Sequence, residues 1–166
     1  MLDKNLLLVD IGGTNIRYAY SNIGDSGFVS ENKAELDSLN DFDNLMSVLL
    51  AESDVKNIVF SVAGPKVNNS IKMTNRNFEI DADEIRKKFN LESCYLLNDW
   101  ESIGYSIRTF SENDFDNFKE GQPFNDTFLV IGPGTGLGAS VISGNNVIAT
   151  EIGNTNLGLS ALKSLL

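Results

Sequence analysis

Residues 6–20 read LLLVDIGGTNIRYAY, in which an apolar run, a glycine turn and a second apolar and aromatic run follow one another. This pattern predicts two strands joined by a tight turn, because glycine adopts backbone conformations that other side chains forbid. The first strand is expected to end at Asp10 and the turn to span Ile11 to Asn15. Consecutive main-chain N–H groups in such a turn can hold phosphate oxygens.

A second stretch of the same kind occupies residues 128–142, which read FLVIGPGTGLGASVI. It predicts strands over 128–131 and 139–142 with a glycine-rich turn between them. Two such turns in one chain are more informative than either alone. We expect them to hold one polyphosphate from both sides of a cleft.

Length and composition limit how large a core the chain can bury and which classes of partner it can bind. The 166 residues are 42% hydrophobic, which suffices for one complete domain and part of a second. The formal net charge of −10, from 23 acidic and 13 basic residues, makes the average surface repel nucleic acid and anionic lipid. We therefore expect no nucleic-acid partner. A phosphate ligand would need local neutralisation by Mg²⁺, backbone N–H groups or a few placed cations.

Cysteine content and hydropathy indicate the compartment. Cys94 is the single cysteine, so the chain forms no internal disulfide, as is typical of a reducing cytosol. The first ten residues contain too short an apolar run for a signal peptide, and no run approaches the roughly 20 apolar residues of a membrane helix. The sequence predicts a cytoplasmic protein without a membrane partner.

The remaining pattern alternates strands and helices. A chain of this order predicts an α/β fold with a mixed sheet, antiparallel at one edge, whose faces are covered by crossover helices. Polar residues 111–126 are expected to form a surface connection, and a new domain to open near residue 110. The expected elements after the first hairpin are strand 28–33, helix 39–50, strand 57–63, a helix beginning near residue 81, strand 95–97 and helix 100–107.

Five motifs in this order resemble the N-terminal part of a bacterial-type glucokinase, in the hexokinase and actin-like ATPase superfamily. They extend along nearly all of the chain, at residues 8–17 (LVDIGGTNIR), 63–65 (AGP), 73–75 (MTN), 97–100 (LNDW) and 132–138 (GPGTGLG). The resemblance implies an actin-like ATPase (ribonuclease H-like) fold with a mixed five-stranded sheet. Residues 1–109 would form the small N-terminal domain, and residues 110–166 the beginning of a similar large domain, apparently truncated.

The same resemblance implies ATP-dependent phosphorylation of a hexose, most simply glucose to glucose 6-phosphate at the entry of glycolysis, with ATP and Mg²⁺ as cofactors. Asp10 would hold Mg²⁺ through water, since Mg²⁺ takes only one or two carboxylates beside phosphate oxygens. The first turn would face the terminal phosphate and the second would wrap the inner phosphates. The alternative for Asp10 is an Asx turn that closes the hairpin. The residues of the two turns are Gly12, Gly13, Thr14, Asn15, Gly134, Thr135 and Gly136.

Asp99 is the candidate catalytic residue. Phosphoryl transfer needs a carboxylate to accept the proton of the attacking hydroxyl, and Asp99 follows an apolar strand, where α/β folds present ligand groups. It is also expected to bind the substrate, together with Asn98, whose amide can donate to and accept from a sugar hydroxyl. Alternatively, Asp99 caps the helix that begins at Trp100, and both roles can hold at once.

A further part of the sugar site is implied at Glu151, where the family has a sugar-binding Glu. The resemblance weakens just beyond it, because the family has a His after the glycine at 153 and this chain, which contains no His, has Asn154. Asparagine can still bond a sugar, so the identity of the sugar stays open, and a plain surface loop is an equal alternative. Asn75 is expected to shape a loop near the sugar or simply to form a turn.

Other features are interpreted structurally. Trp100 is expected to be a core or cleft-wall aromatic, and Arg17, within the second strand, to pair with a nearby acid. Family members are roughly twice as long, so the chain is either a fragment or a short relative without turnover, and its exposed apolar surface would favour a homodimer. Two other functions remain open: a non-catalytic sugar-binding or regulatory module, and a phosphotransferase of the same fold acting on a non-hexose substrate.

Overall fold

A computed structural model describes residues 3–12, 15–35, 38–73, 79–119, 121–122, 125–133 and 137–152. The chain divides into two compact units, Met1–Asp99 and Trp100–Leu166. The domain boundary expected near residue 110 stays a prediction.

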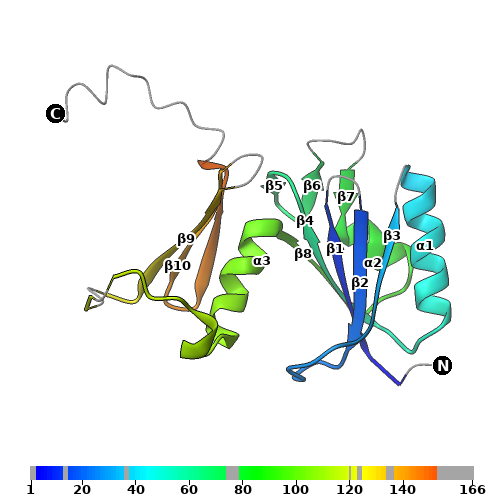
Figure 1. Cartoon of the computed structure of the whole chain (residues 1–166). Helices are drawn as coiled ribbons and strands as arrows, with labels where there is room; N and C mark the ends of the chain where they lie inside the picture. The colour runs from blue at the N-terminus through cyan, green and yellow to red at the C-terminus, as the bar shows by residue number, and fades with distance from the viewer. Residues whose placement is uncertain are drawn as a thin grey trace, which may run out of the picture. The chain divides into compact units, whose positions relative to one another are not determined.

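The first unit is built on a five-stranded mixed sheet, which confirms the predicted fold class (Figure 1). The two pairs at one side, β1–β2 and β2–β3, are antiparallel, whereas β1–β4 and β4–β8 are parallel. The parallel pairs require crossover connections, and helices supply both of them. In the order β3-β2-β1-β4-β8 the strands are Val29–Glu35, Asn15–Ser21, Leu6–Ile11, Asn57–Val62 and Ser93–Asn98.

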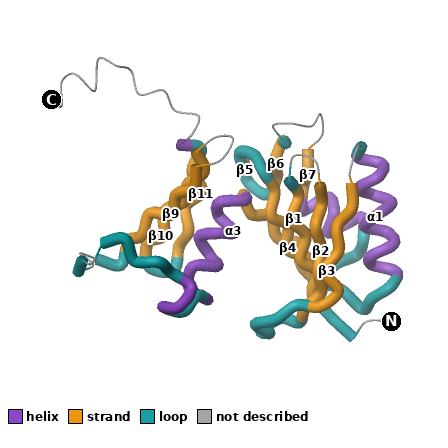
Figure 2. The backbone as a smooth tube through the Cα atoms, in the orientation of Figure 1, coloured by secondary structure: helices purple, strands orange, loops and turns teal. Residues whose placement is uncertain are grey.

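The crossover helices α1 (Leu39–Ala51) and α2 (Ala82–Lys88) begin where the sequence predicts helix starts. The Ser38 hydroxyl accepts a hydrogen bond from the Asp41 amide at 3.2 Å. The Asp81 carboxylate accepts bonds from the amides of residues 83 and 84, at 2.9 Å each. These caps satisfy N–H groups that have no partner inside the helix. In Figure 2, α1 and α2 appear as the purple helices of this unit.

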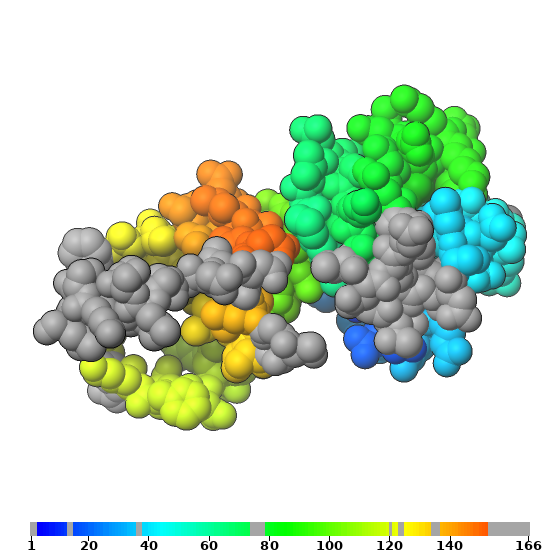
Figure 3. All heavy atoms as spheres, turned by 90° about the horizontal axis from the view of Figure 1, so that it is seen from above, coloured from blue at the N-terminus to red at the C-terminus, as the bar shows by residue number. Residues whose placement is uncertain are grey.

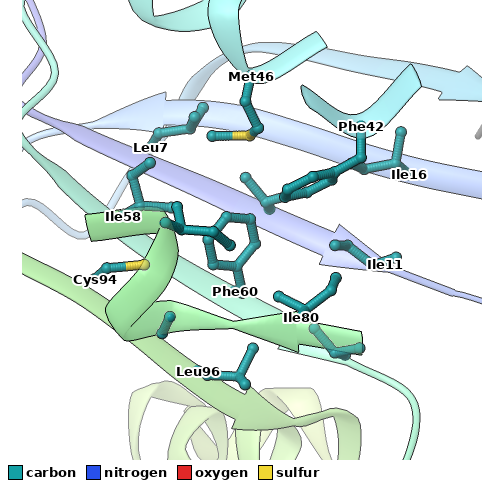
Figure 4. Close-up of a cluster of buried hydrophobic side chains, with 14 of the residues drawn as sticks. Leu7, Ile11, Ile16, Phe42, Met46, Ile58, Phe60, Ile80, Cys94 and Leu96 are labelled. Atoms are coloured by element: carbon teal, nitrogen blue, oxygen red, sulfur yellow. The ribbon is translucent and has the colours of Figure 1, made fainter. Parts of the chain in front are cut away.

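The core of this unit lies between the sheet and both helices (Figure 4). Phe42 of α1 packs on Phe60 of β4 with ring centroids 5.9 Å apart. Met46 and Ile85 join the same buried cluster, one from each helix, so α1 and α2 cover a single face of the sheet. The helical spacing of the apolar residues of α1 predicted this buried stripe.

A small antiparallel sheet between β4 and α2 was not among the expected elements. It has the order β5-β6-β7 and consists of Lys66–Val67, Ser70–Lys72 and Glu79–Asp81. Strands of two or three residues are too short to show the alternation that identifies a strand. Asn75, with its expected loop-shaping role, lies outside the described residues.

The second unit contains α3 (Asp99–Ser106), which begins where the first unit ends, and an antiparallel sheet of order β11-β10-β9. The strands β9 (Thr127–Pro133), β10 (Leu137–Ser143) and β11 (Asn146–Thr150) confirm the second glycine hairpin. The connection after α3 contains two short 3₁₀ helices, Ile107–Thr109 and Glu112–Asp114, and lies on the surface (yellow-green in Figure 3). None of the helices that the structure describes is long and apolar enough to cross a membrane.

Candidate functional site

Three parallel strands of the first unit end at one edge of the sheet and bring the candidate acids to it. The pairing aligns Ile11 of β1 with Val62 of β4, and Val62 with Asn98 of β8. Asp10 therefore lies one residue before the aligned row of Ile11, Val62 and Asn98, and Asp99 lies one residue after it. Strands lie about 4.8 Å apart and rise about 3.3 Å per residue, so two strand spacings and an offset of two residues separate the two acidic positions by roughly 12 Å. The carboxyl edge of parallel strands is where ligands bind in α/β folds.

Asp10 is half-exposed and makes an ion pair. Its Oδ2 lies 3.6 Å from Arg17 Nη1, across the β1–β2 ladder, in which the two residues are direct partners. This confirms that Arg17 pairs with a nearby acid. With side chains 48% and 61% exposed, the two charges remain largely solvated, and exposed pairs of this kind contribute little to stability. The pairing leaves Asp10 near the solvent at the strand end.

The first glycine turn is closed by a backbone hydrogen bond from the Gly12 N–H to the Asn15 carbonyl, at 2.9 Å. A Cβ added to Gly12 would have the Asn15 carbonyl oxygen at 3.6 Å, an ordinary contact. Packing within the described residues therefore does not require glycine at position 12. Gly13 and Thr14, which the resemblance assigns to phosphate binding, lie outside the described residues.

Asn98 is buried, with 2% of its surface exposed, and its Nδ2 donates a hydrogen bond to the carbonyl oxygen of Gly64 at 2.9 Å. Gly64 has a φ of +148°, and a Cβ there would lie 2.8 Å from the carbonyl oxygen of Lys72. Only glycine fits this position without a shift of backbone. Sequence reasoning assigned Asn98 to the sugar and missed this structural bond, because nothing in the AGP motif marks which carbonyl it presents.

Asp99 is the first residue of α3 and is half-buried. Its place directly after β8 is the one that the sequence predicts. The carboxylate is thus at a strand-to-helix junction, where both expected roles, helix start and proton acceptor, are chemically available. Its catalytic role stays a prediction.

The second glycine motif carries a contact that sequence reasoning missed. Gly132 and Gly138 are direct partners in the β9–β10 ladder, and the Trp100 indole lies against both. A Cβ added to Gly132 would come 2.1 Å from Trp100 Cη2. The first and last glycines of the GPGTGLG motif therefore make room for an aromatic ring. Gly134, Thr135 and Gly136 lie outside the described residues.

Glu151 lies immediately after β11 and is exposed. The preceding residue, Thr150, donates a side-chain hydrogen bond to the Ala139 carbonyl at 2.8 Å, which ties this end of β11 to β10. Asn154 lies outside the described residues. The sugar-binding roles of Glu151 and Asn154 stay predictions.

Among the described residues of the second unit, the buried polar side chains are Glu101 of α3 and Ser140 of β10, and neither was singled out from the sequence. A helix as short as α3 offers too little periodicity to show which polar residue faces inward.

The buried thiol of Cys94 is chemically inert, because burial raises its pKa from 9.0 to about 12 and the thiolate is the nucleophile.

In the described ranges, no three His, Cys, Asp or Glu side chains gather into a metal site.

Comparison with known proteins identifies the family of the chain. A family model described as Glucokinase matches residues 7–163. A glucokinase from Nostoc punctiforme is 30% identical over 150 residues, covering 85% of this chain and 44% of that protein. The chain thus spans less than half the length of this relative.

Solved structures show the same fold. The crystal structure of a glucokinase from an Antarctic psychrotroph has a TM-score of 0.74 at 25% identity, covering 95% of this chain and 53% of that one. A ROK family glucokinase from Streptomyces griseus, solved with glucose and AMPPNP, has a TM-score of 0.64 at 20% identity, covering 86% of this chain and 46% of that one. From the extent of the family match and the shared architecture, we conclude that the chain belongs to the glucokinase family.

Proposed function

We propose that the chain is the N-terminal portion of an ATP-dependent hexose kinase that converts glucose to glucose 6-phosphate. Membership of the glucokinase family supports the reaction class. The Streptomyces griseus relative with bound glucose and AMPPNP supports the pair of ligands. The chain covers only 44% of its Nostoc relative. Kinase activity is therefore proposed for a whole protein of which this chain would be the N-terminal portion.

The observation that carries the proposal is the position of Asp99 directly after β8, at the same sheet edge as Asp10 at the end of β1. A phosphoryl transfer site needs a proton acceptor beside the attacking hydroxyl and a separate acid near the phosphates. Two acids separated by one strand meet this need, since sugar and phosphate can lie side by side along the edge.

In the proposed mechanism, Asp99 accepts the proton of the sugar hydroxyl as the hydroxyl oxygen bonds to the terminal phosphorus of ATP. The bond from that phosphorus to the bridging oxygen breaks, and ADP leaves. Asn98, Glu151 and Asn154 contribute to sugar binding and orientation. Asp10 would hold Mg²⁺, which would supply positive charge beside the phosphates. Backbone N–H groups at residues 12–15 and 134–136 bind phosphate oxygens.

Calorimetry with glucose and with Mg·ATP, each alone, followed by an assay for glucose 6-phosphate, tests the proposal. Binding of both ligands with turnover supports it. Asp99→Asn should lower kcat by roughly 10²–10⁴, the usual loss for a general base. Asp116→Asn, the same substitution on the exposed connection after α3, is the matched control. Unchanged turnover in Asp99→Asn would remove Asp99 from its role.

A second candidate is a non-catalytic sugar-binding or regulatory module. It is favoured by Asn154, which stands where the family has a sugar-binding His, in a chain without any His. Glucose binding without turnover would support this candidate. Mg·ATP binding without hexose binding would instead favour a phosphotransferase acting on another substrate.

Cytoplasmic location and a homodimer also belong to the proposal. A single cysteine that is free and buried fits a reducing compartment. Exposed apolar side chains on β9 and β11 provide a surface on which a second copy of the chain can pack.

A further inference from the structure

The Trp100 indole lies across both strands of the β9–β10 hairpin at one pair of facing residues. The six-membered ring lies at Gly132, where an added Cβ would be 2.1 Å from Cη2 and 2.8 Å from Cζ2. The pyrrole nitrogen lies at Gly138, where an added Cβ would be 1.6 Å from Nε1. Because Gly132 and Gly138 are direct partners, one ring touches both ends of the glycine motif.

This rung lies next to the end of the hairpin. The last pair of the ladder is Pro133 with Leu137, and residues 134–136 connect the two. A contact that fixes the positions of the paired residues Gly132 and Gly138 therefore also fixes the base of the turn, which is proposed to bind the inner phosphates. A ring that packs on both strands restrains both sides of the turn at once.

The helix that carries Trp100 is also held against this sheet farther along. Gly104 lies four residues after Trp100, on the same face of α3. A Cβ added to Gly104 would be 2.6 Å from Val147 Cγ1 and 2.8 Å from Ser140 Oγ. Gly104 on the helix, and the Gly132–Gly138 pair on the sheet, thus let α3 approach the sheet closely at both places. The part of α3 from Trp100 onward is thus fixed relative to the glycine hairpin.

We propose that Trp100 is a positioning residue for nucleotide binding, whose indole holds the base of the second glycine turn against the first turn of α3. The inference rests on the proposed kinase function and adds a role to a residue that the resemblance leaves structural. It also gives a role to Gly132 and Gly138. These two glycines make room for the indole, and residues 134–136 alone are proposed to bind the phosphate oxygens.

The decisive test is a double-mutant cycle between Gly138→Ala and Trp100→Ala, measured on the full chain by calorimetry with Mg·ATP. In Gly138→Ala the new methyl group displaces the indole, and the affinity for Mg·ATP should fall roughly 2- to 30-fold, as for mutations that act on a site indirectly. In a Trp100→Ala background the same change should have much less further effect, because the three atoms nearest the new methyl group all belong to the indole. Gly121→Ala is the matched control, since its added Cβ would have nothing within 4 Å.

A loss of affinity from Gly138→Ala that is equal with and without the indole would overturn the inference, because the methyl group would then act directly on the phosphate. Failure of the unmodified chain to bind Mg·ATP would instead count against the kinase function itself. Hydrogen exchange without nucleotide separates the two cases. We expect amides of β9 and β10 to exchange faster in Trp100→Ala and in Trp100→Leu than in the unmodified chain. Equal exchange in all three proteins would overturn the positioning role whatever the nucleotide result.

Discussion

Asn98 donates a hydrogen bond from Nδ2 to the carbonyl oxygen of Gly64 at 2.9 Å, and so joins the end of β8 to the loop that follows β4. We expect Asn98→Ala to lower the free energy of unfolding by about 1–3 kcal/mol, because it removes the donor from a buried carbonyl. Urea denaturation measures this effect. Asn117→Ala, on the exposed connection, is the matched control, and equal midpoints for both variants would contradict a structural role for Asn98.

The same contact can be tested from the other side. Gly64→Ala should destabilise the first unit by about 1–3 kcal/mol or more, since φ is +148° and the new Cβ would meet the Lys72 carbonyl. Gly27→Ala adds a methyl group with no atom within 4 Å and should change stability by less than about 0.5 kcal/mol. A stable, fully folded Gly64→Ala variant would show that this loop adapts easily.

The buried thiol of Cys94 predicts a component of the pH dependence of stability. Burial, with smaller contributions from the charges of Asp83 and Asp81, raises the pKa of the folded thiol from 9.0 to about 12. Below pH 9 the thiol is protonated in both states and its contribution is fully present. As pH rises toward 12, the unfolded thiol loses its proton first, so the free energy of unfolding should fall by up to about 1.4 kcal/mol per pH unit. Cys94→Ala should lack this component in denaturation curves compared at matched pH, and parallel curves would contradict it.

Ser140 is completely buried, and its hydroxyl has no hydrogen-bond partner within the part of the chain that the structure describes. Removing an unsatisfied buried hydroxyl relieves its desolvation, so Ser140→Ala should be neutral or should stabilise the second unit by up to about 1–3 kcal/mol. Gly104→Ala should destabilise, because its Cβ would lie 2.8 Å from Ser140 Oγ. Thermal denaturation of both single variants and of the double variant provides the test. Strong destabilisation by Ser140→Ala would indicate that the hydroxyl has a partner.

One face of the β11-β10-β9 sheet is apolar and exposed, with Leu129 at 61%, Ile131 at 57% and Ile148 at 55%. Alternation along β9 places this face opposite the one at which Gly132 meets the indole, and the register aligns Leu129, Val141 and Ile148. We expect the chain to self-associate with rising concentration, and the double variant Leu129→Lys/Ile148→Glu to do so less. Sedimentation velocity measures this. Val67→Lys, on another sheet, is the control, and a monomer at every concentration would argue against the homodimer.

Much of the fold could be predicted because long elements carry their own periodicity. The apolar strand before Asp10, the helical spacing around Phe42 and Met46, and the acid cap at Asp81 all agree with the structure. The β5-β6-β7 sheet was missed because its strands are too short to show a pattern. Periodicity depends on neighbours in sequence, and these strands are defined by their partners in space.

The positions of the candidate residues on the strands could be predicted from the sequence, whereas their contacts could not. The position of Asp99 after β8 follows from the strand that precedes it. The bond from Asn98 to Gly64 and the contact of Trp100 with a glycine pair depend on how segments far apart in sequence meet. No local pattern in one sequence distinguishes a glycine that admits a phosphate from one that admits an indole.

A crystal structure of the chain with glucose and AMPPNP tests the central claim most directly. The account predicts a glucose hydroxyl within hydrogen-bond distance of the Asp99 carboxylate, and phosphate oxygens at the backbone N–H groups of residues 12–15 and 134–136. Glucose bound away from an Asp99 that faces bulk solvent, or phosphates that touch neither glycine turn, would contradict it.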